Sequence, residues 1–111
     1  MGADFHIQLF LLRLRKAWNR PDRIFLAPRA KNLESMARLG FVMEDIKVMC
    51  IELHPEERIA GPCVDDKGRP GGIWVFHHTY KGQLMYLKFS LDMVDSQDLL
   101  TIISCHEEGL A

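Results

Sequence analysis

The 111-residue sequence lacks long apolar runs and paired cysteines, and each absence excludes a class of protein. No apolar run is longer than the four residues 9–12, whereas a membrane span needs roughly 18, and no small-residue cleavage site follows it. We therefore expect a cytoplasmic protein without a membrane partner. The three cysteines contain no C-x-x-C pair, which argues against disulfides and structural zinc. We expect Cys50, Cys63 and Cys105 to be buried.

The net charge of −1 conceals an uneven distribution of charge. Residues 1–31 contain seven Lys or Arg and two Asp, a balance of +5, whereas residues 32–111 contain seven basic and thirteen acidic residues, a balance of −6. A basic segment of this kind can attract a phosphate backbone. The alternative is a solvated helix face followed by a charged connector.

Hydrophobic periodicity predicts helices in the first half of the chain. Residues 4–19, 32–39 and 44–53 repeat apolar side chains at helical spacing, and Gly40 is placed to end the second helix. The side chains expected to be buried are Ile7, Leu11, Leu14 and Trp18 in the first helix, Leu33, Met36 and Ala37 in the second, and Ile46, Met49, Cys50 and Leu53 in the third.

The second half of the chain has the composition of strands. Residues 73–80, 83–91 and 99–105 are rich in β-branched and aromatic residues, residues 23–28 form an extended piece, and residues 58–60 form a weak strand. Helices followed by a meander of strands indicate an α+β fold. We expect the whole chain to form one domain, with the N-terminal helices packed on one face of a small antiparallel sheet.

The dipeptide Lys81-Gly82 predicts a two-residue hairpin that pairs Tyr80 with Gln83. Opposed residues share a face of a sheet, and so do alternate residues of one strand. One face is then expected to be a core face, made of Trp74, Phe76, His78, Met85, Leu87 and Phe89. The other face is polar and is made of Val75, His77, Thr79, Tyr86, Lys88 and Ser90.

The polar face suits RNA cleavage without a metal or other cofactor. His77 can act as acid or base, Lys88 can stabilise the charge of a phosphorane, and Tyr86 can orient the 2′-OH or stack on a base. His106 ends the last strand near the same edge, on a face that the sequence leaves undecided. The alternative is that this is merely the solvated face of an antiparallel sheet.

Two other readings of the polar residues are weaker. His77, His78 and His106 resemble metal ligands, but consecutive histidines point to opposite faces of a strand and no carboxylate or Cys completes the set. Asp65 and Asp66 lie in a Gly- and Pro-rich loop, where one carboxylate could act as the base of a different, metal-requiring hydrolase. Capping of backbone N–H groups in the turn explains this pair more simply.

The order and spacing of several motifs resemble those of the MqsR-family toxins of bacterial type II toxin–antitoxin systems. The resemblance covers roughly residues 29–108. Its motifs are residues 31–40, Gly61-Pro62 with Asp65, residues 69–76 with their W-x-F strand, the Met-Tyr-Leu-Lys of residues 85–88, and the Ile-Ser-Cys-His-Glu of residues 103–107.

The resemblance implies a RelE-like fold, an mRNA endoribonuclease activity that slows growth, and a cognate antitoxin protein as partner. By position, Tyr86 falls on the family's sheet tyrosine and Lys88 follows at the family's spacing, while His106 stands where a lysine occurs in the family. We expect His77, Tyr86, Lys88 and His106 to be catalytic. We expect Arg29, Lys31 and Arg69 to bind RNA phosphates.

Two positions depart from the family pattern. Val75 stands where the family has a glutamine directly after the strand tryptophan. At about Ala60, this chain has no counterpart of the lysine that some family members have before the loop. Part of the polar set is therefore missing, so that either His77 replaces it or the activity is weaker. A non-catalytic protein- or RNA-interaction domain on the same fold is the alternative function.

Overall fold

A computed structural model describes residues 2–64, 66–68 and 71–109, and within them the chain forms a five-stranded sheet and three α-helices. This architecture confirms the predicted α+β class. In chain order the elements are α1 (Gly2–Ala17), η1 (Pro21–Arg23), β1 (Ile24–Leu26), α2 (Ala30–Leu39), α3 (Met43–Glu52), η2 (Pro55–Glu57), β2 (Arg58–Cys63), β3 (Ile73–Tyr80), β4 (Gln83–Val94) and β5 (Gln97–Glu107).

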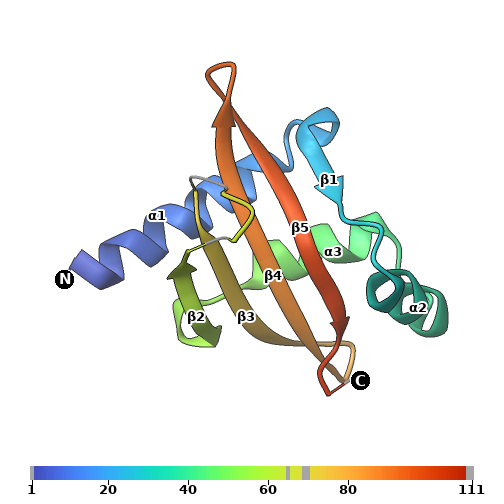
Figure 1. Cartoon of the computed structure of the whole chain (residues 1–111). Helices are drawn as coiled ribbons and strands as arrows, with labels where there is room; N and C mark the ends of the chain where they lie inside the picture. The colour runs from blue at the N-terminus through green and yellow to red at the C-terminus, as the bar shows by residue number, and fades with distance from the viewer. Residues whose placement is uncertain (1, 65, 69–70, 110–111) are drawn as a thin grey trace.

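The strands are ordered β1-β5-β4-β3-β2, and all neighbours are antiparallel except β1, which runs parallel to β5 (Figure 1). The predicted hairpin is confirmed, because Tyr80 pairs with Gln83 and the register continues to Trp74 opposite Phe89. Both turn residues, Lys81 and Gly82, have positive φ angles of 50° and 80°, as a tight turn between twisted strands requires.

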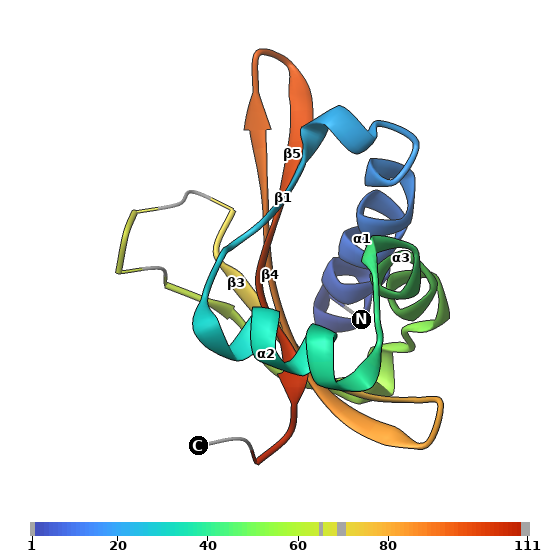
Figure 2. The same cartoon turned by 90° about the vertical axis from the view of Figure 1, so that its right-hand side faces the viewer.

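Helices α1 and α3 cover one face of the sheet, and the loop between β2 and β3 lies on the opposite side (Figure 2). We call the side without α1 and α3 the open face. The covered face holds the main core, where Trp74, Leu87 and Phe89 are buried in one cluster with Leu11 of α1 and Ile46 of α3, as predicted. The covered face of the sheet therefore forms the main core of the protein.

Several of the seven basic side chains in residues 1–31 contact distant parts of the fold. Arg13 forms an ion pair with Asp98 at 2.6 Å, and Arg15 donates to the carbonyl oxygen of Leu53 at 2.9 Å. Arg23 donates to the carbonyl oxygen of Val94 at 2.5 Å. These contacts account for part of the N-terminal excess of positive charge. Among the described residues, no helix combines the length and the apolar character needed to cross a membrane.

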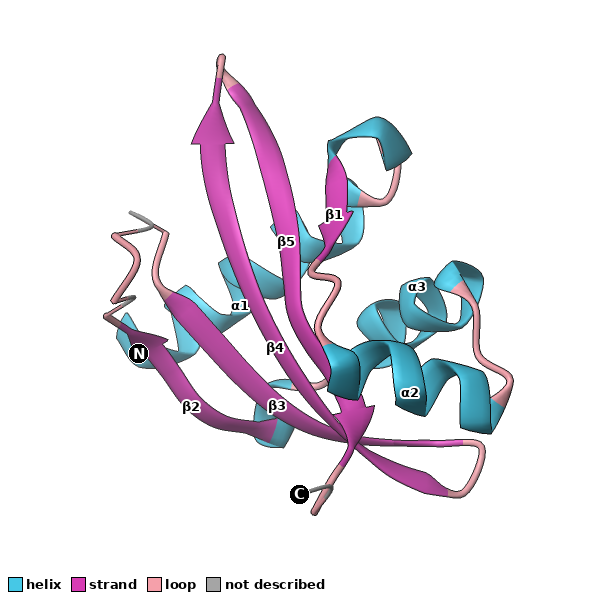
Figure 3. Ribbon diagram, turned by 45° about the vertical axis from the view of Figure 1, so that its right-hand side comes forward, coloured by secondary structure: helices cyan, strands magenta, loops and turns pink. Residues whose placement is uncertain are grey.

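Helix α2 buries polar residues, which the sequence analysis did not expect. Leu33 is 51% exposed and Ala37 is also exposed, so their predicted inward placement is wrong, whereas Asn32 and Ser35 are fully buried. The reason is that α2 packs beside the lower half of β5 (Figure 3), where Asn32 and Ser35 face the strand. Met36 and Leu39 are partly buried against the main core. Gly40 ends the helix in the left-handed conformation, as predicted.

Asn32 and Ser35 complete the edge of β5 where β1 no longer accompanies it. The amide nitrogen of Asn32 donates to the carbonyl oxygens of Ala27 and Ile103 at 2.9 and 3.0 Å, and its amide oxygen accepts from the backbone N–H of Cys105 at 2.9 Å. The hydroxyl of Ser35 accepts from the N–H of Glu107 at 3.2 Å. Two side chains one helical turn apart thus replace a neighbouring strand.

The same stretch of β5 contains a bulge. Lys88 pairs with Ser104 while Phe89 pairs with Ile102, so Ile103 is an extra residue without a partner on β4. One extra residue reverses the alternation of side chains beyond it. As a result Ser104 shares the face of Lys88, whereas Ile102 shares the covered face of Phe89.

Asp45 connects the start of α3 to the β3–β4 hairpin. Its carboxylate accepts from the backbone N–H of Val42 at 2.8 Å and from the hydroxyl of Tyr80 at 2.7 Å. These two hydrogen bonds lower the pKa of Asp45, with the larger effect from Val42, and the bond to the carboxylate raises the pKa of Tyr80 to about 12. The contact therefore favours a charged Asp45 and a neutral Tyr80.

We expect Asn32→Ala to lower the free energy of unfolding by about 2–4 kcal/mol, because each buried backbone group left without a partner costs about 1–3 kcal/mol. Urea unfolding followed by circular dichroism measures the change. The control is Asn19→Ala at an exposed position, which should change stability by less than about 0.5 kcal/mol. Equal stability of the two variants would contradict the role assigned to Asn32.

Replacing Asp45 should alter how stability depends on pH. Because the pKa of Asp45 is lower in the folded protein, its stabilising effect is present above the ordinary pKa of 3.8 and is lost as the pH falls through the folded value. In Asp45→Asn the urea midpoint should therefore fall less steeply below about pH 5 than in the wild type. Tyr80→Phe, which removes one of the donors to Asp45 and leaves those of Val42 and Lys81, should give an intermediate slope. Identical slopes in all three proteins would refute the assignment.

Candidate functional site

Three side chains form a row across the open face, one from each of the three central strands. His77 of β3 pairs with Tyr86 of β4, which pairs with His106 of β5. The rings of His77 and Tyr86 meet edge to face with centroids 6.1 Å apart, and those of Tyr86 and His106 stack at 5.2 Å. The structure therefore brings three of the four predicted catalytic side chains into one row and places His106 on the open face.

The contacts of the two imidazoles determine which nitrogen carries a proton. The Nε2 atom of His77 lies against the carboxylate of Glu108, which can only accept, so Nε2 is the donor. The Nδ1 atom of His106 lies 2.9 Å from the carbonyl oxygen of Glu107, which can only accept. In the neutral rings, Nδ1 of His77 and Nε2 of His106 are then the proton acceptors.

Glu108 is the residue of this site that the sequence analysis missed. It follows β5, and its backbone N–H donates to the carbonyl oxygen of Leu84 at 3.0 Å, which turns the carboxylate towards His77. Both side chains are 35% exposed, so the pair is accessible from solvent. The run of two glutamates after His106 was the only available signal, because the contact depends on the pairing of β4 with β5.

A second row lies next to the first on the same face. Lys88, the fourth predicted catalytic residue, pairs with Val75 on one side and with Ser104 on the other. Arg29, which precedes α2, donates through Nη1 to the hydroxyl of Ser104 at 2.8 Å and to the carbonyl oxygen of Ile103 at 3.3 Å. Two cationic side chains are thus held beside Ser104.

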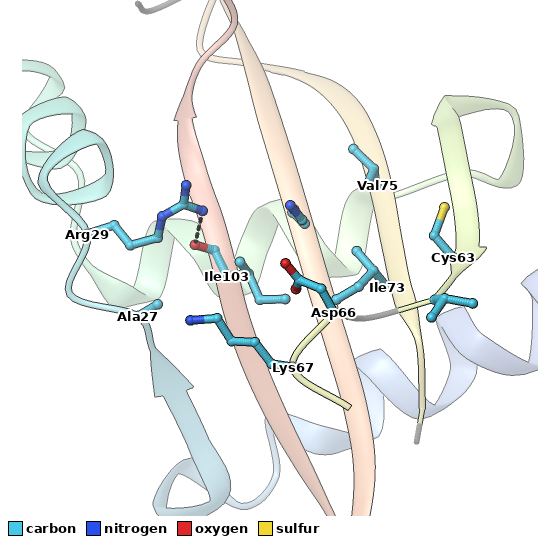
Figure 4. Close-up of a pocket in the computed structure, with 10 residues that line it drawn as sticks. Ala27, Arg29, Cys63, Asp66, Lys67, Ile73, Val75 and Ile103 are labelled. Atoms are coloured by element: carbon cyan, nitrogen blue, oxygen red, sulfur yellow. Dashed lines mark hydrogen bonds between the residues drawn. The ribbon is translucent and has the colours of Figure 1, made fainter. Parts of the chain in front are cut away.

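A cavity of about 720 Å³ lies on the open face, beside this second row (Figure 4). Its floor is a small apolar cluster, separate from the main core, that consists of Ile73, Val75 and Ile103. Its polar lining, among the described residues, consists of Arg29, Lys67, Lys88 and Asp66. The described charges around the cavity are thus three positive and one negative, although the chain as a whole carries −1.

The loop that borders the cavity is held against β4 at Gly71. The N–H of Gly71 donates to the carboxylate of Asp92 at 2.7 Å, and Asp92 also accepts from the hydroxyl of Ser90 at 3.0 Å. A Cβ atom at residue 71 would lie 2.1 Å from the carbonyl oxygen of Leu91, so only glycine permits this close approach. The chain therefore returns to β3 along the open face.

Of the three residues predicted to bind RNA, one lines the cavity. Arg29 lines the cavity, whereas Lys31 lies in the first turn of α2 and is not part of the described lining. Arg69 and Asp65 lie outside the described residues. Asp66 lines the cavity from the loop.

His78 belongs to the other face, as the hairpin register predicted. It is buried, and its two ring nitrogens lie 2.8 and 2.9 Å from carboxylate oxygens of Glu57 and Glu52. This arrangement ties β3 to α3 and η2. His78 is therefore a structural residue, and it does not share a site with His77.

The cysteines differ in their surroundings. Cys50 and Cys105 are buried as predicted, and burial raises the pKa of both thiols, that of Cys105 to about 12. The predicted burial of Cys63 is wrong, because this residue ends the edge strand β2 and its side chain lines the cavity in an exposed position.

Comparisons of the chain with models of protein families, with curated proteins and with solved structures give no match. The resemblance to the MqsR-family toxins therefore stays a prediction from sequence motifs, and the function has to be argued from the residues of the open face.

Proposed function

We propose that the protein is an endoribonuclease that cleaves RNA on its open face without a metal ion. The observation that carries the proposal is the row His77–Tyr86–His106, in which two imidazoles flank a tyrosine and Lys88 stands in the next row. Imidazoles supply acid–base catalysis near neutral pH, and a lysine stabilises developing negative charge. These are the groups that intramolecular cleavage of RNA requires.

His77 is suited to act as the base. Glu108 holds the proton of Nε2, so Nδ1 has a free lone pair that can take the proton of a ribose 2′-OH. The carboxylate then stabilises the imidazolium that forms, as the orienting carboxylate does in serine protease triads. The 2′ oxygen attacks the adjacent phosphorus atom, and a phosphorane with additional negative charge results.

His106 is suited to act as the acid, from the opposite side of Tyr86. Its imidazolium would donate the Nε2 proton to the 5′ oxygen as the bond between that oxygen and phosphorus breaks, which leaves a 2′,3′-cyclic phosphate and a free 5′-OH. The carbonyl oxygen of Glu107 fixes the ring through Nδ1. Lys88 stabilises the charge of the phosphorane, and the hydroxyl of Tyr86 orients the 2′-OH.

The toxin role is part of the same proposal. Its support is the motif order that resembles the MqsR family, together with the occurrence of Tyr86 and Lys88 on one exposed face. An mRNA substrate and a neutralising antitoxin protein are the partners that this role requires. A non-catalytic interaction domain remains the competing function, and the presence of Val75 instead of a polar residue beside the row favours it.

Alanine substitution at the row should abolish cleavage while the fold is kept. For His77→Ala and His106→Ala we expect the cleavage rate to fall by about 10²–10⁴-fold, the usual contribution of one acid or base. Tyr86→Phe and Lys88→Ala should also reduce the rate. The measurement is cleavage of a fluorescent RNA by purified protein in EDTA, with mapping of 5′-OH ends.

The matched controls are His54→Ala and Lys81→Ala, whose side chains are exposed away from the row. They should cleave at the wild-type rate. If a quadruple variant with His77, Tyr86, Lys88 and His106 all replaced still cleaves RNA, the proposed chemistry is wrong. The same holds if cleavage stops in EDTA. If the wild-type protein neither cleaves RNA nor slows growth on expression, the interaction-domain function is favoured.

The role of Glu108 can be tested separately. Glu108→Gln keeps the shape of the side chain but removes the charge that stabilises the His77 imidazolium, so kcat should fall by about 10–100-fold, less than on loss of the imidazole itself. KM should not change, because Glu108 contacts the ring. Glu56→Gln, on η2, is the control and should behave as wild type. A rise in KM with unchanged kcat would assign Glu108 to RNA binding instead.

A further inference from the structure

We infer that the cavity on the open face binds one nucleotide of the RNA chain, with the base on the apolar floor and the phosphate between Arg29 and Lys88. The inference rests on the proposed function and specifies how the same face holds its substrate. The cavity volume of about 720 Å³ falls within the roughly 300–1,000 Å³ of sites for small ligands.

The floor has the character of a surface for a base rather than for an ion. Ile73, Val75 and Ile103 form an apolar cluster of their own on the open face, and they are only 6–9% exposed. A phosphate or other small anion would gain nothing from this cluster. A flat aromatic base would cover it and remove its remaining apolar area from water.

The side chains of Arg29 and Lys88, beside the floor, are placed where they can bind one phosphate group. Arg29 uses a single nitrogen, Nη1, to reach Ser104 and Ile103, and a guanidinium has five N–H donors, so donors remain for an anion. Lys88 pairs with the same Ser104 from the neighbouring strand. Arginine binds phosphate through charge-assisted hydrogen bonds, which are stronger than neutral ones.

Asp66 gives the ligand an orientation. Its carboxylate lines the cavity from the loop, while Arg29 stands across the sheet from that loop (Figure 4). A phosphate is repelled by the carboxylate and attracted to the arginine. The phosphate is therefore directed towards β5, and the base lies nearer to the loop and the strand β3.

The cavity is continuous with the proposed catalytic row. Val75 is two residues from His77 on β3, and Lys88 is two residues from Tyr86 on β4, so each pair points to the same face. Two residues along a strand span about 6.6 Å. A nucleotide bound in the cavity would thus be the direct neighbour of the scissile phosphate, and Lys88 would contact both.

The test uses the whole protein with labelled isoleucine and valine methyl groups and is read by NMR. The probes are adenosine 3′-monophosphate, inorganic phosphate and adenosine, each titrated alone. We expect the mononucleotide to move the methyl signals of Ile73, Val75 and Ile103 upfield, because the ring current of a stacked base shields them. Phosphate alone should leave these signals in place, and adenosine alone should bind more weakly than the mononucleotide.

Variants separate the contributions to binding. Arg29→Gln should weaken binding of the mononucleotide by about tenfold or more, since it removes a charge-assisted contact. Because Arg29 also holds Ile103 and Ser104, Lys88→Gln serves as a second variant with the same expectation. Arg20→Gln is the matched control, since Arg20 is exposed and pairs with Asp22, and it should bind as wild type.

The outcomes distinguish this inference from the proposed function. If phosphate binds as tightly as the mononucleotide, or if the three methyl signals do not move, the cavity is not a nucleotide site even when the protein cleaves RNA. If the methyl signals move as expected and no cleavage of RNA is found, the nucleotide site stands and the nuclease proposal fails. Binding that persists in His77→Ala, where cleavage is lost, supports both.

Discussion

The open face depends on the way in which two side chains of α2 complete the edge of β5. Asn32 and Ser35 supply hydrogen-bond partners for the backbone at Ile103, Cys105 and Glu107, where no strand continues beside them. Buried backbone groups need such partners, so the lower half of β5 is held in place with its bulge. The bulge in turn places Ser104 and His106 on the side of Lys88 and Tyr86, instead of in the core. Without the extra residue, His106 would share the face of Ile102.

The two faces of the sheet use their polar groups in different ways. On the covered side, His78 and the carboxylates of Glu52 and Glu57 join strand to helix, and arginines of α1 bind Asp98 and a backbone carbonyl. These charged groups hold elements of the fold together. On the open side, which faces away from α1 and α3, the polar groups line a cavity and a row of three rings. A site for an anionic substrate can therefore exist on a protein whose net charge is slightly negative.

The candidate site was accessible to sequence reasoning only where its contacts are local. The hairpin at Lys81 and Gly82 determines the register of β3 and β4, so the opposition of His77 and Tyr86, and of Val75 and Lys88, could be derived from the turn. The face on which each residue of β5 lies could not be derived in this way, because no residue in the run Leu-Leu-Thr-Ile-Ile-Ser-Cys indicates a bulge. For the same reason Glu108 went unnoticed, since its approach to His77 requires three strands in the correct register.

The sequence by itself determined the class of fold, the helices α1 and α3 with their buried stripes, and the alternating faces of the hairpin, because periodicity and turn chemistry are properties of neighbouring residues. Only the tertiary structure decided that α2 buries Asn32 and Ser35 while Leu33 stays exposed, that Cys63 is accessible, and that His106 joins the row on the open face. Each of these depends on which backbone groups at a distant strand edge need a partner. That demand arises only after the strands have paired, so no local pattern in the chain records it.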